Sequence, residues 1–312
     1  MIFIFSSARS GSTWLAKAFD SHPDTIYRHE PDIVDRGNDL LPYWFEDDSR
    51  GSEEQAKIYL ERLLSNRNLR TVGTQPFFRK SYRGDMARGI HASLIYLGKG
   101  LEKAGLAKMA QNITIPDLAR TGVTPKIVIK SVSALGRAEA LIKANTAVAP
   151  VLLLRHPCAY VNSYLRGNQL GVMPPPRPLG DLLKTRSARR LDAGRAVSSA
   201  GGLVETLAWD WLLANCEAYP AISQKGAVLR YEDLTQNPES QLRALFSKLD
   251  LEWSDTTTQF LKASSAGDGS YYSLARDPVA AANKWKSQLP PQHIEQIRNI
   301  VCRDPIGERY FG

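Results

Sequence analysis

A run of small hydroxyl residues around a glycine follows the first apolar stretch of the chain. The stretch Ile2–Phe5 leads into Ser6-Ser7-Ala8-Arg9-Ser10-Gly11-Ser12-Thr13-Trp14, and an amphipathic segment comes next. A glycine in such a loop lets successive backbone N–H groups turn toward an anion, and the amino end of the following helix adds partial positive charge. Ser12 and Thr13 add hydroxyl donors, and Arg9 adds a fixed, forked charge. The loop is therefore predicted to bind phosphate.

This loop differs from the Walker nucleotide loop, GxxxxGK[ST]. Ser6 and Ser12 stand where that motif requires glycine and lysine, which disfavours triphosphate hydrolysis. An ordinary serine-capped helix behind an edge strand would have the same local sequence, so the loop by itself leaves that interpretation open.

A second possible phosphate contact begins at Arg155. The apolar run Val151–Leu154 ends in Arg155-His156-Pro157, and Ser163 follows Arg155 by eight residues. Proline suits the first turn of a helix, which would place Ser163 about two turns along, on the side of the strand end. Arg155 and Ser163 could then bind one phosphate together. Each residue taken alone is more simply a surface arginine and a mid-helix serine, but the pairing with the first loop favours the phosphate site.

The elements that must position these residues alternate along the chain. Four short apolar runs are typical of buried parallel strands: Ile2–Phe5, Lys126–Ile129, Val151–Leu154 and Ala227–Leu229. Seven stretches are predicted to be helical: Thr13–Phe19, Glu53–Ser65, Leu135–Lys143, Tyr160–Leu165, Leu203–Tyr219, Glu239–Leu249 and Gln292–Val301. This alternation predicts an α/β fold, a single domain over residues 1–312 with a central parallel sheet flanked by helices. Ligands of such sheets bind beyond the carboxyl ends of the strands.

Two segments interrupt the alternation. Residues 171–202 contain a proline-rich run followed by basic residues, and they are predicted to form a mobile basic loop excursion over the site. Residues 264–283 are rich in Gly, Ser and Ala and are predicted to form a second loop.

Composition narrows the classes of function. The chain has 312 residues, 43% hydrophobic and 23% charged, with a net charge of +8. That composition suits a globular protein, and the positive charge suits either anionic partners or simply a soluble surface. Cys158, Cys216 and Cys302 show no paired spacing and are expected to be reduced thiols, and the five histidines do not cluster, so no metal is expected. The short apolar start lacks a basic leader and no run could span a membrane, so a cytoplasmic protein of unknown oligomeric state is expected.

The two predicted phosphate sites together resemble those of sulfotransferases that use 3'-phosphoadenosine 5'-phosphosulfate (PAPS). Arg9-Ser10-Gly11-Ser12-Thr13-Trp14 is similar to the family's 5'-phosphosulfate loop, and Arg155 with Ser163 is similar to its 3'-phosphate element. An arginine at the first place of the loop is typical of the carbohydrate and protein-tyrosine members. The resemblance implies a P-loop-like sulfotransferase fold, with PAPS as donor and 3'-phosphoadenosine 5'-phosphate (PAP) as product. It also implies that Arg9 stabilises charge on the transferred group and that Trp14 lies against the adenine.

Further donor contacts are implied by the same resemblance. Leu229-Arg230-Tyr231-Glu232-Asp233-Leu234 resembles a segment whose tyrosine reaches the adenine, which implies that role for Tyr231. Lys284-Trp285-Lys286 resembles a segment that closes over the donor, with Arg276 as a further candidate; an ordinary basic loop is an equal alternative there.

The general base of the reaction has two candidates near the loop, His29 and Glu30. A positioned carboxylate or imidazole can accept the proton of an attacking hydroxyl. The resemblance favours Glu30 as base and leaves His29 to bind the acceptor; a loop acid paired with a cation is the plainer alternative for Glu30. Phenol-type members use a histidine after a Lys-Thr pair, whereas this strand ends Lys130-Ser131-Val132, so Lys130 alone matches and could touch the leaving oxygen or a donor phosphate.

The sequence therefore predicts a PAPS-dependent sulfotransferase acting on a hydroxyl of a carbohydrate or another small molecule. Three segments are expected to line the acceptor pocket: 32–48, 77–115 and 171–202. Two alternatives remain. One is a nucleotide-dependent phosphotransferase, which lacks the Walker lysine and an evident magnesium ligand. The other is a non-catalytic binder of sulfated or phosphorylated glycans that uses the basic residues between Lys184 and Arg195. Nucleic acid is not an expected partner, because aromatic residues do not interleave with the basic ones.

Overall fold

A wholly parallel sheet lies at the centre of the molecule. The computed structural model describes residues 1–33, 39–46, 53–173, 176, 178–197, 201–265 and 278–312. The sheet has the strand order β2-β3-β1-β4-β5, and every neighbouring pair is parallel. Its strands are β1 (Ile2–Ser6), β2 (Thr25–His29), β3 (Lys126–Ser131), β4 (Ala149–Leu154) and β5 (Ala227–Arg230). The predicted α/β fold, with a central parallel sheet flanked by helices, is confirmed.

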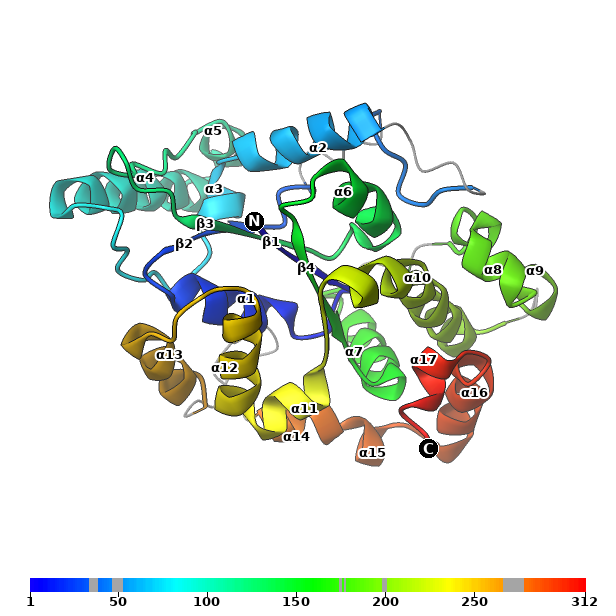
Figure 1. Ribbon diagram of the computed structural model, residues 1–312. Helices are drawn as coiled ribbons and strands as arrows, with labels where there is room; N and C mark the ends of the chain where they lie inside the picture. Colours follow the sequence, from blue (N-terminus) through cyan, green and yellow to red (C-terminus); the bar gives the residue numbers. More distant parts are fainter. Residues whose placement is uncertain (34–38, 47–52, 174–175, 177, 198–200, 266–277) are drawn as a thin grey trace.

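Helices cover both faces of the sheet (Figure 1). Successive side chains of a strand point to opposite faces: Phe3 and Phe5 belong to one buried cluster, and Ile2 and Ile4 belong to the other. The first cluster includes α2 (Glu53–Ser65), α6 (Ala138–Ala144), α7 (Pro157–Gln169), α10 (Leu203–Lys225) and α16 (Pro291–Val301). The second includes α1 (Ser12–Ser21), α12 (Pro238–Lys248) and α13 (Asp255–Ser265). Strands buried on both faces explain why their sequences are continuous apolar runs rather than alternating ones.

Shorter helices complete the described chain. They are α3 (Leu69–Val72), α5 (Ala107–Gln111), η1 (Leu135–Arg137), η2 (Leu182–Lys184), α8 (Arg186–Arg190), α9 (Ala193–Ala196), α11 (Tyr231–Gln236), α14 (Pro278–Asn283), α15 (Trp285–Gln288) and α17 (Pro305–Glu308). The long α4 (Asp85–Lys103) lies beyond the edge strand β2 and packs with α3 and α5 around a small cluster of its own (Figure 1).

The four predicted strands and seven predicted helices are all present, with ends shifted by a few residues. Several elements were not predicted, and two of them, β2 and α4, border the site regions described below. The strand β2 carries Arg28 and His29, which interrupt its apolar pattern. The helix α4 contains Gly89, Gly98 and Gly100, which are poor helix formers, and only Ile95 and Gly98 of the helix are buried.

The two predicted loops contain helices. The basic excursion 171–202 holds η2, α8 and α9, and the described side chains of Leu182, Ala188 and Ala193 are buried against the domain. Most of the second loop, residues 266–277, lies outside the described residues, and α14 forms its end. No helix within the described ranges is long and apolar enough to cross a membrane. Cys158, Cys216 and Cys302 are free thiols.

Candidate active site

The predicted site residues follow the carboxyl ends of the strands. Parallel strands end at the same edge of a sheet, where ligands of such folds bind. At this edge lie Ser7 to Gly11 after β1, Glu30 after β2, Lys130 and Ser131 at the end of β3, Arg155 after β4 and Tyr231 after β5. All five strands therefore contribute.

The loop after β1 has the geometry of an anion-binding turn. Gly11 caps α1 in the left-handed conformation, with φ 83°, and no side chain caps the helix. Arg9 is also left-handed, with φ 67°, a conformation that costs a non-glycine residue about 1–3 kcal/mol and is common at functional sites. The buried hydroxyls of Ser6 and Ser7 have no hydrogen-bond partner among the described residues. Because buried polar groups are normally paired, these hydroxyls fit a loop that binds an anionic ligand.

The second predicted phosphate element touches the first directly. Nη1 of Arg155 donates to the backbone carbonyl of Arg9 at 2.5 Å, across 146 positions of sequence. Nε of Arg9 donates to Oγ of Ser163 at 3.2 Å. Ser163 lies on α7, where Pro157 occupies the first turn. The two elements thus form one cluster, as a single bisphosphorylated ligand would require.

Tyr231 packs between these two elements. The guanidinium of Arg155 lies 5.0 Å from the centre of its ring. The ring also lies so close to Gly11 that a Cβ added there would be 2.2 Å from Cε2. Only glycine permits this approach. The ring therefore fixes the loop after β1 against the ends of β4 and β5.

Trp14 lies on the first turns of α1. Its indole Nε1 donates to Oγ of Ser264 at 3.0 Å, and its ring lies 6.1 Å from that of Phe260. These contacts hold Trp14 against α13, at the boundary of the undescribed residues 266–277.

The predicted contribution of the Lys284 segment is only partly visible. The carbonyl of Ala281 accepts from Nη2 of Arg155 at 3.0 Å, and Trp285 stacks on His156 at 4.3 Å. The segment therefore packs on the end of β4. The side chain of Lys284 is exposed and makes no hydrogen bond or ion pair to another residue in the described ranges. Arg276 lies outside the described residues.

Glu30 and Lys130 form a buried ion pair at the ends of neighbouring strands. Oε1 of Glu30 accepts from Nζ of Lys130, and the backbone N–H of Glu30 donates to the carbonyl of Lys130 at 2.8 Å. Glu30 has φ 45°, a second strained position at this edge. Burial opposes the charge of Glu30, but Lys130, His29 and Arg70 outweigh it and hold the pKa of this carboxyl below its ordinary value. Glu30 is therefore ionised at neutral pH, as a base must be.

His29 is held in one orientation beside this pair. Its Nδ1 is hydrogen bonded to the hydroxyl of Tyr27 at 2.7 Å, and its Nε2 lies 3.9 Å from Oε2 of Glu30. Burial and then the charge of Lys130 lower the pKa of His29 to about 4. His29 is therefore neutral at pH 7.

The sequence analysis did not identify two residues that lie beside Glu30 and His29. Arg70 places Nη2 4.0 Å from Oε2 of Glu30, and Tyr27 orients His29. Tyr27 could have been found from the alternation within β2, because it shares a face with His29 two residues later. Nothing in the sequence around Arg70 connects that residue with Glu30.

The basic residues of the 171–202 segment are largely engaged with acids. Lys184 pairs with Glu46 at 2.8 Å. Arg190 pairs with Asp304 at 2.6 Å, and Arg186 lies 3.6 Å from Glu139. These contacts fasten the segment to the domain, and they leave less free charge for a polyanion than the sequence alone indicates.

Stability is expected to fall with acidity partly through His156. Its Nδ1 accepts from the backbone N–H of Cys158, and burial lowers its pKa to about 3. Between pH 6.5 and 3 the unfolded chain binds a proton here that the folded chain does not, so the contribution is complete above pH 6.5 and is lost as pH falls. One such proton gives a slope of about 1.4 kcal/mol per pH unit. His156→Asn keeps a capping side chain and should flatten the curve of unfolding free energy against pH by this amount. Parallel curves for the two proteins would contradict this.

Comparison with known proteins finds a sequence similarity that covers part of the chain. No family model matches the chain. Carbohydrate sulfotransferase 2 of Mus musculus and of Homo sapiens are each 33% identical to it over 84 residues, which cover 26% of this chain and 16% of each relative. The chain therefore matches well under a quarter of the length of these curated relatives.

Two solved structures align with nearly all of this chain, at low sequence identity. The sulfotransferase domain from the curacin biosynthetic pathway has a TM-score of 0.48 and 18% identity, with 97% of this chain and 98% of that chain covered. Mouse sulfotransferase SULT7A1 complexed with PAP has a TM-score of 0.47 and 10% identity, with 99% and 87% covered. The resemblance predicted from the motifs is confirmed: this chain is similar, in part of its sequence, to a carbohydrate sulfotransferase.

Proposed function

We propose that this chain is a sulfotransferase that transfers the sulfuryl group of PAPS to a hydroxyl of an acceptor. The observation that carries the proposal is the contact of Arg155 with the Arg9 carbonyl, which joins the two predicted phosphate elements in one cluster. A donor with phosphate groups at both its 5' and 3' positions matches such a pair of elements. The partial similarity to carbohydrate sulfotransferase 2 supports this function and makes a carbohydrate the first acceptor to test.

The donor would lie across the ends of β1, β4 and β5. The loop from Ser10 to Trp14 would hold the 5'-phosphosulfate, and Arg155 with Ser163 would hold the 3'-phosphate. Tyr231 contacts both elements, and its ring would pack on the adenine. No group of His, Cys, Asp or Glu in the described part of the chain is arranged to hold a metal ion.

The reaction would take place at the ends of β2 and β3. The acceptor oxygen attacks sulfur in line, the bond from sulfur to the 5'-phosphate oxygen breaks, and the acceptor proton passes to Glu30. Arg9, in the loop after β1, and Lys130, beside Glu30, would supply fixed positive charge, and such preorganised charge stabilises negative charge that develops on a leaving phosphate. His29 would bind the acceptor beside Glu30.

Arg155→Lys should weaken PAP binding at least about tenfold, because lysine keeps the charge but loses the forked donors. Isothermal titration with PAP measures the effect, and transfer of radiolabelled sulfate from PAPS to an acceptor panel tests the activity. Arg243→Lys is the matched control, since Arg243 also lies over an aromatic ring, Trp253 at 4.2 Å, but on α12. Unchanged PAP affinity in Arg155→Lys would refute the assignment, and heat protection by ATP but not PAP would favour a phosphotransferase.

A further inference from the structure

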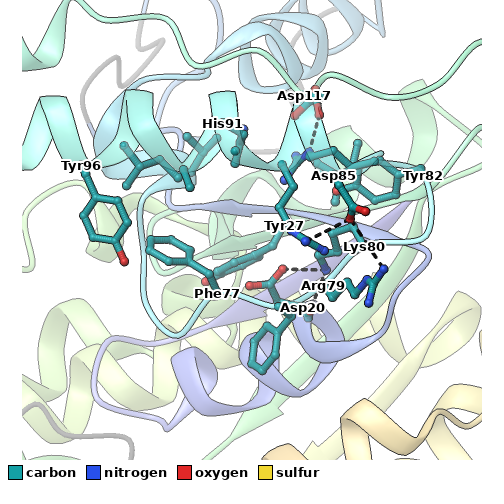
Figure 2. Close-up of a pocket in the computed structure, with 18 of the residues that line it drawn as sticks. Asp20, Tyr27, Phe77, Arg79, Lys80, Tyr82, Asp85, His91, Tyr96 and Asp117 are labelled. Carbon is teal, nitrogen blue, oxygen red and sulfur yellow. Dashed lines mark hydrogen bonds and ion pairs between the residues drawn. The ribbon is translucent and has the colours of Figure 1, made fainter.

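A cavity of about 540 Å³ lies at the edge of the sheet, beside β2 and beneath α4 (Figure 2). Its wall includes Ile26 to Arg28 of the strand, the segment from Phe77 to Arg83, and one side of α4 as far as Tyr96. None of Arg9, Glu30, Lys130, Arg155 and Tyr231 lines it. The cavity is therefore not the donor site. Much of its wall comes from one of the three segments expected to form the acceptor pocket, residues 77–115.

Aromatic rings form much of its wall. Phe77 and Tyr96 meet edge to face, with ring centres 6.4 Å apart, and are 39% and 59% exposed (Figure 2). Phe78, Tyr82 and Tyr27 are further lining residues. Exposed aromatic faces beside a cavity suit a ligand with a flat ring or the apolar face of a sugar.

Most cations of the wall are already paired. Arg28 donates to both carboxylate oxygens of Asp117, at 2.8 and 2.6 Å, and Lys80 lies 3.0 Å from Asp20. Arg79 and Arg88 both lie near Asp85, at 3.6 and 3.0 Å. These pairs shape the wall but offer little net charge to a ligand.

Arg83 is different. Its Nε donates to the backbone carbonyl of Asp117 at 2.9 Å, and its guanidinium lies 5.3 Å from the centre of the Tyr82 ring. It forms no ion pair with any carboxylate in the described ranges. Burial lowers its pKa from the ordinary value of arginine and outweighs the opposing effect of the nearby Tyr82, Asp117 and Asp20. A bound carboxylate or sulfate could accept two hydrogen bonds from such a guanidinium.

Tyr27 connects the cavity with the proposed base. It lines the cavity, and its hydroxyl is hydrogen bonded to His29, which lies beside Glu30. Glu30 follows Tyr27 by three positions, which corresponds to about 10 Å along an extended strand. We propose that this cavity binds a ring carrying a carboxylate or sulfate through Arg83, and, resting on the proposed function, that this ring is the acidic part of the acceptor.

The test compares two probes that differ in one group, 4-nitrophenyl β-D-glucuronide and 4-nitrophenyl β-D-glucoside. Titration without PAPS should show the glucuronide binding at least about tenfold more tightly, and Arg83→Gln should abolish this preference. Arg79→Gln, an exposed arginine of the same wall, should retain it. Phe77→Leu changes an exposed side chain, so the protein should still fold. This variant should weaken the binding of both probes equally.

Equal affinity for the two probes, or an undiminished preference in Arg83→Gln, would overturn the assignment. Arg83→Lys provides a second test if the glutamine variant fails to fold. Because lysine keeps the charge, this variant should retain a reduced preference for the glucuronide. These titrations need no sulfate transfer, so they succeed or fail independently of the proposed function. With a turned-over acidic acceptor, Arg83→Gln should raise KM and leave kcat unchanged; an unchanged KM would refute the acceptor role while the binding result stands.

Discussion

Glu30→Gln is expected to lower sulfate transfer about 10²–10⁴-fold, the range that a positioned general base contributes. Glutamine has nearly the shape of glutamate but cannot take up the proton of the attacking hydroxyl. PAP affinity should be retained, because Glu30 contacts Lys130 and neighbours of β2 rather than the Arg9 and Arg155 elements. Radiolabelled transfer at saturating PAPS, together with PAP titration, measures the two effects separately.

The same substitution also has a structural cost, which must be separated from the loss of catalysis. Lys130 is 2% exposed and would be left without its carboxylate. Removing one partner of a buried ion pair costs about 3–5 kcal/mol, and less here because Glu30 retains some contact with solvent. The double variant Glu30→Gln/Lys130→Met removes both charges, so it should be more stable than Glu30→Gln but no more active.

A matched control is Glu139→Gln on α6, because Glu139 also forms an ion pair with a lysine, Lys143 at 2.8 Å. Its turnover should equal that of the unmodified protein. Transfer by Glu30→Gln within a few-fold of normal, in a folded protein, would eliminate Glu30 as base. The pH dependence of sulfate transfer gives a further check. Because the pKa of Glu30 is held below its ordinary value, the carboxylate stays ionised, and the acid limb of the activity profile should lie below that ordinary value.

The sequence predicted the strand-end residues because each follows a distinct local signal. An apolar run ended by small or basic residues marks the carboxyl end of a buried parallel strand, and four of the five strands carry that signal. The contact between Arg155 and Arg9 follows from topology, since β4 is the neighbour of β1 and their ends are adjacent.

The remaining features depend on contacts that local sequence does not encode. The cavity beside β2 requires α4, a helix with three glycines and few buried residues, which shows little helical signal. The pairing of Glu30 with Lys130 requires β2 to lie beside β3, and β2 is an edge strand whose apolar pattern is interrupted. The approach of Tyr231 to Gly11 depends on side-chain packing between residues far apart in the chain. These are tertiary features, which override local propensity.

Gly11→Ala is expected to disrupt the donor site and destabilise the fold, for two reasons that can be separated. The left-handed conformation, φ 83°, disfavours a Cβ by about 1–2 kcal/mol. In addition, the new methyl would lie 2.2 Å from Cε2 of Tyr231, and overpacking of a buried contact costs about 1–3 kcal/mol more. Relief of the clash must move a ring that is 7% exposed and lies beneath the Arg155 guanidinium. PAP affinity should therefore fall at least about tenfold, the effect of a loss of about 1.4 kcal/mol.

Gly105→Ala isolates the backbone effect, because Gly105 has nearly the same φ, 81°, and no atom within 4 Å of the added methyl. Its loss of unfolding free energy should be the smaller of the two, with normal PAP binding. The double variant Gly11→Ala/Tyr231→Leu should recover part of the stability lost in Gly11→Ala, since the shorter side chain makes room for the methyl. Denaturant unfolding and PAP titration of the four proteins test this. Equal destabilisation by Gly11→Ala and Gly105→Ala, with PAP binding intact in both, would mean that the Tyr231 contact does not hold the donor loop in place.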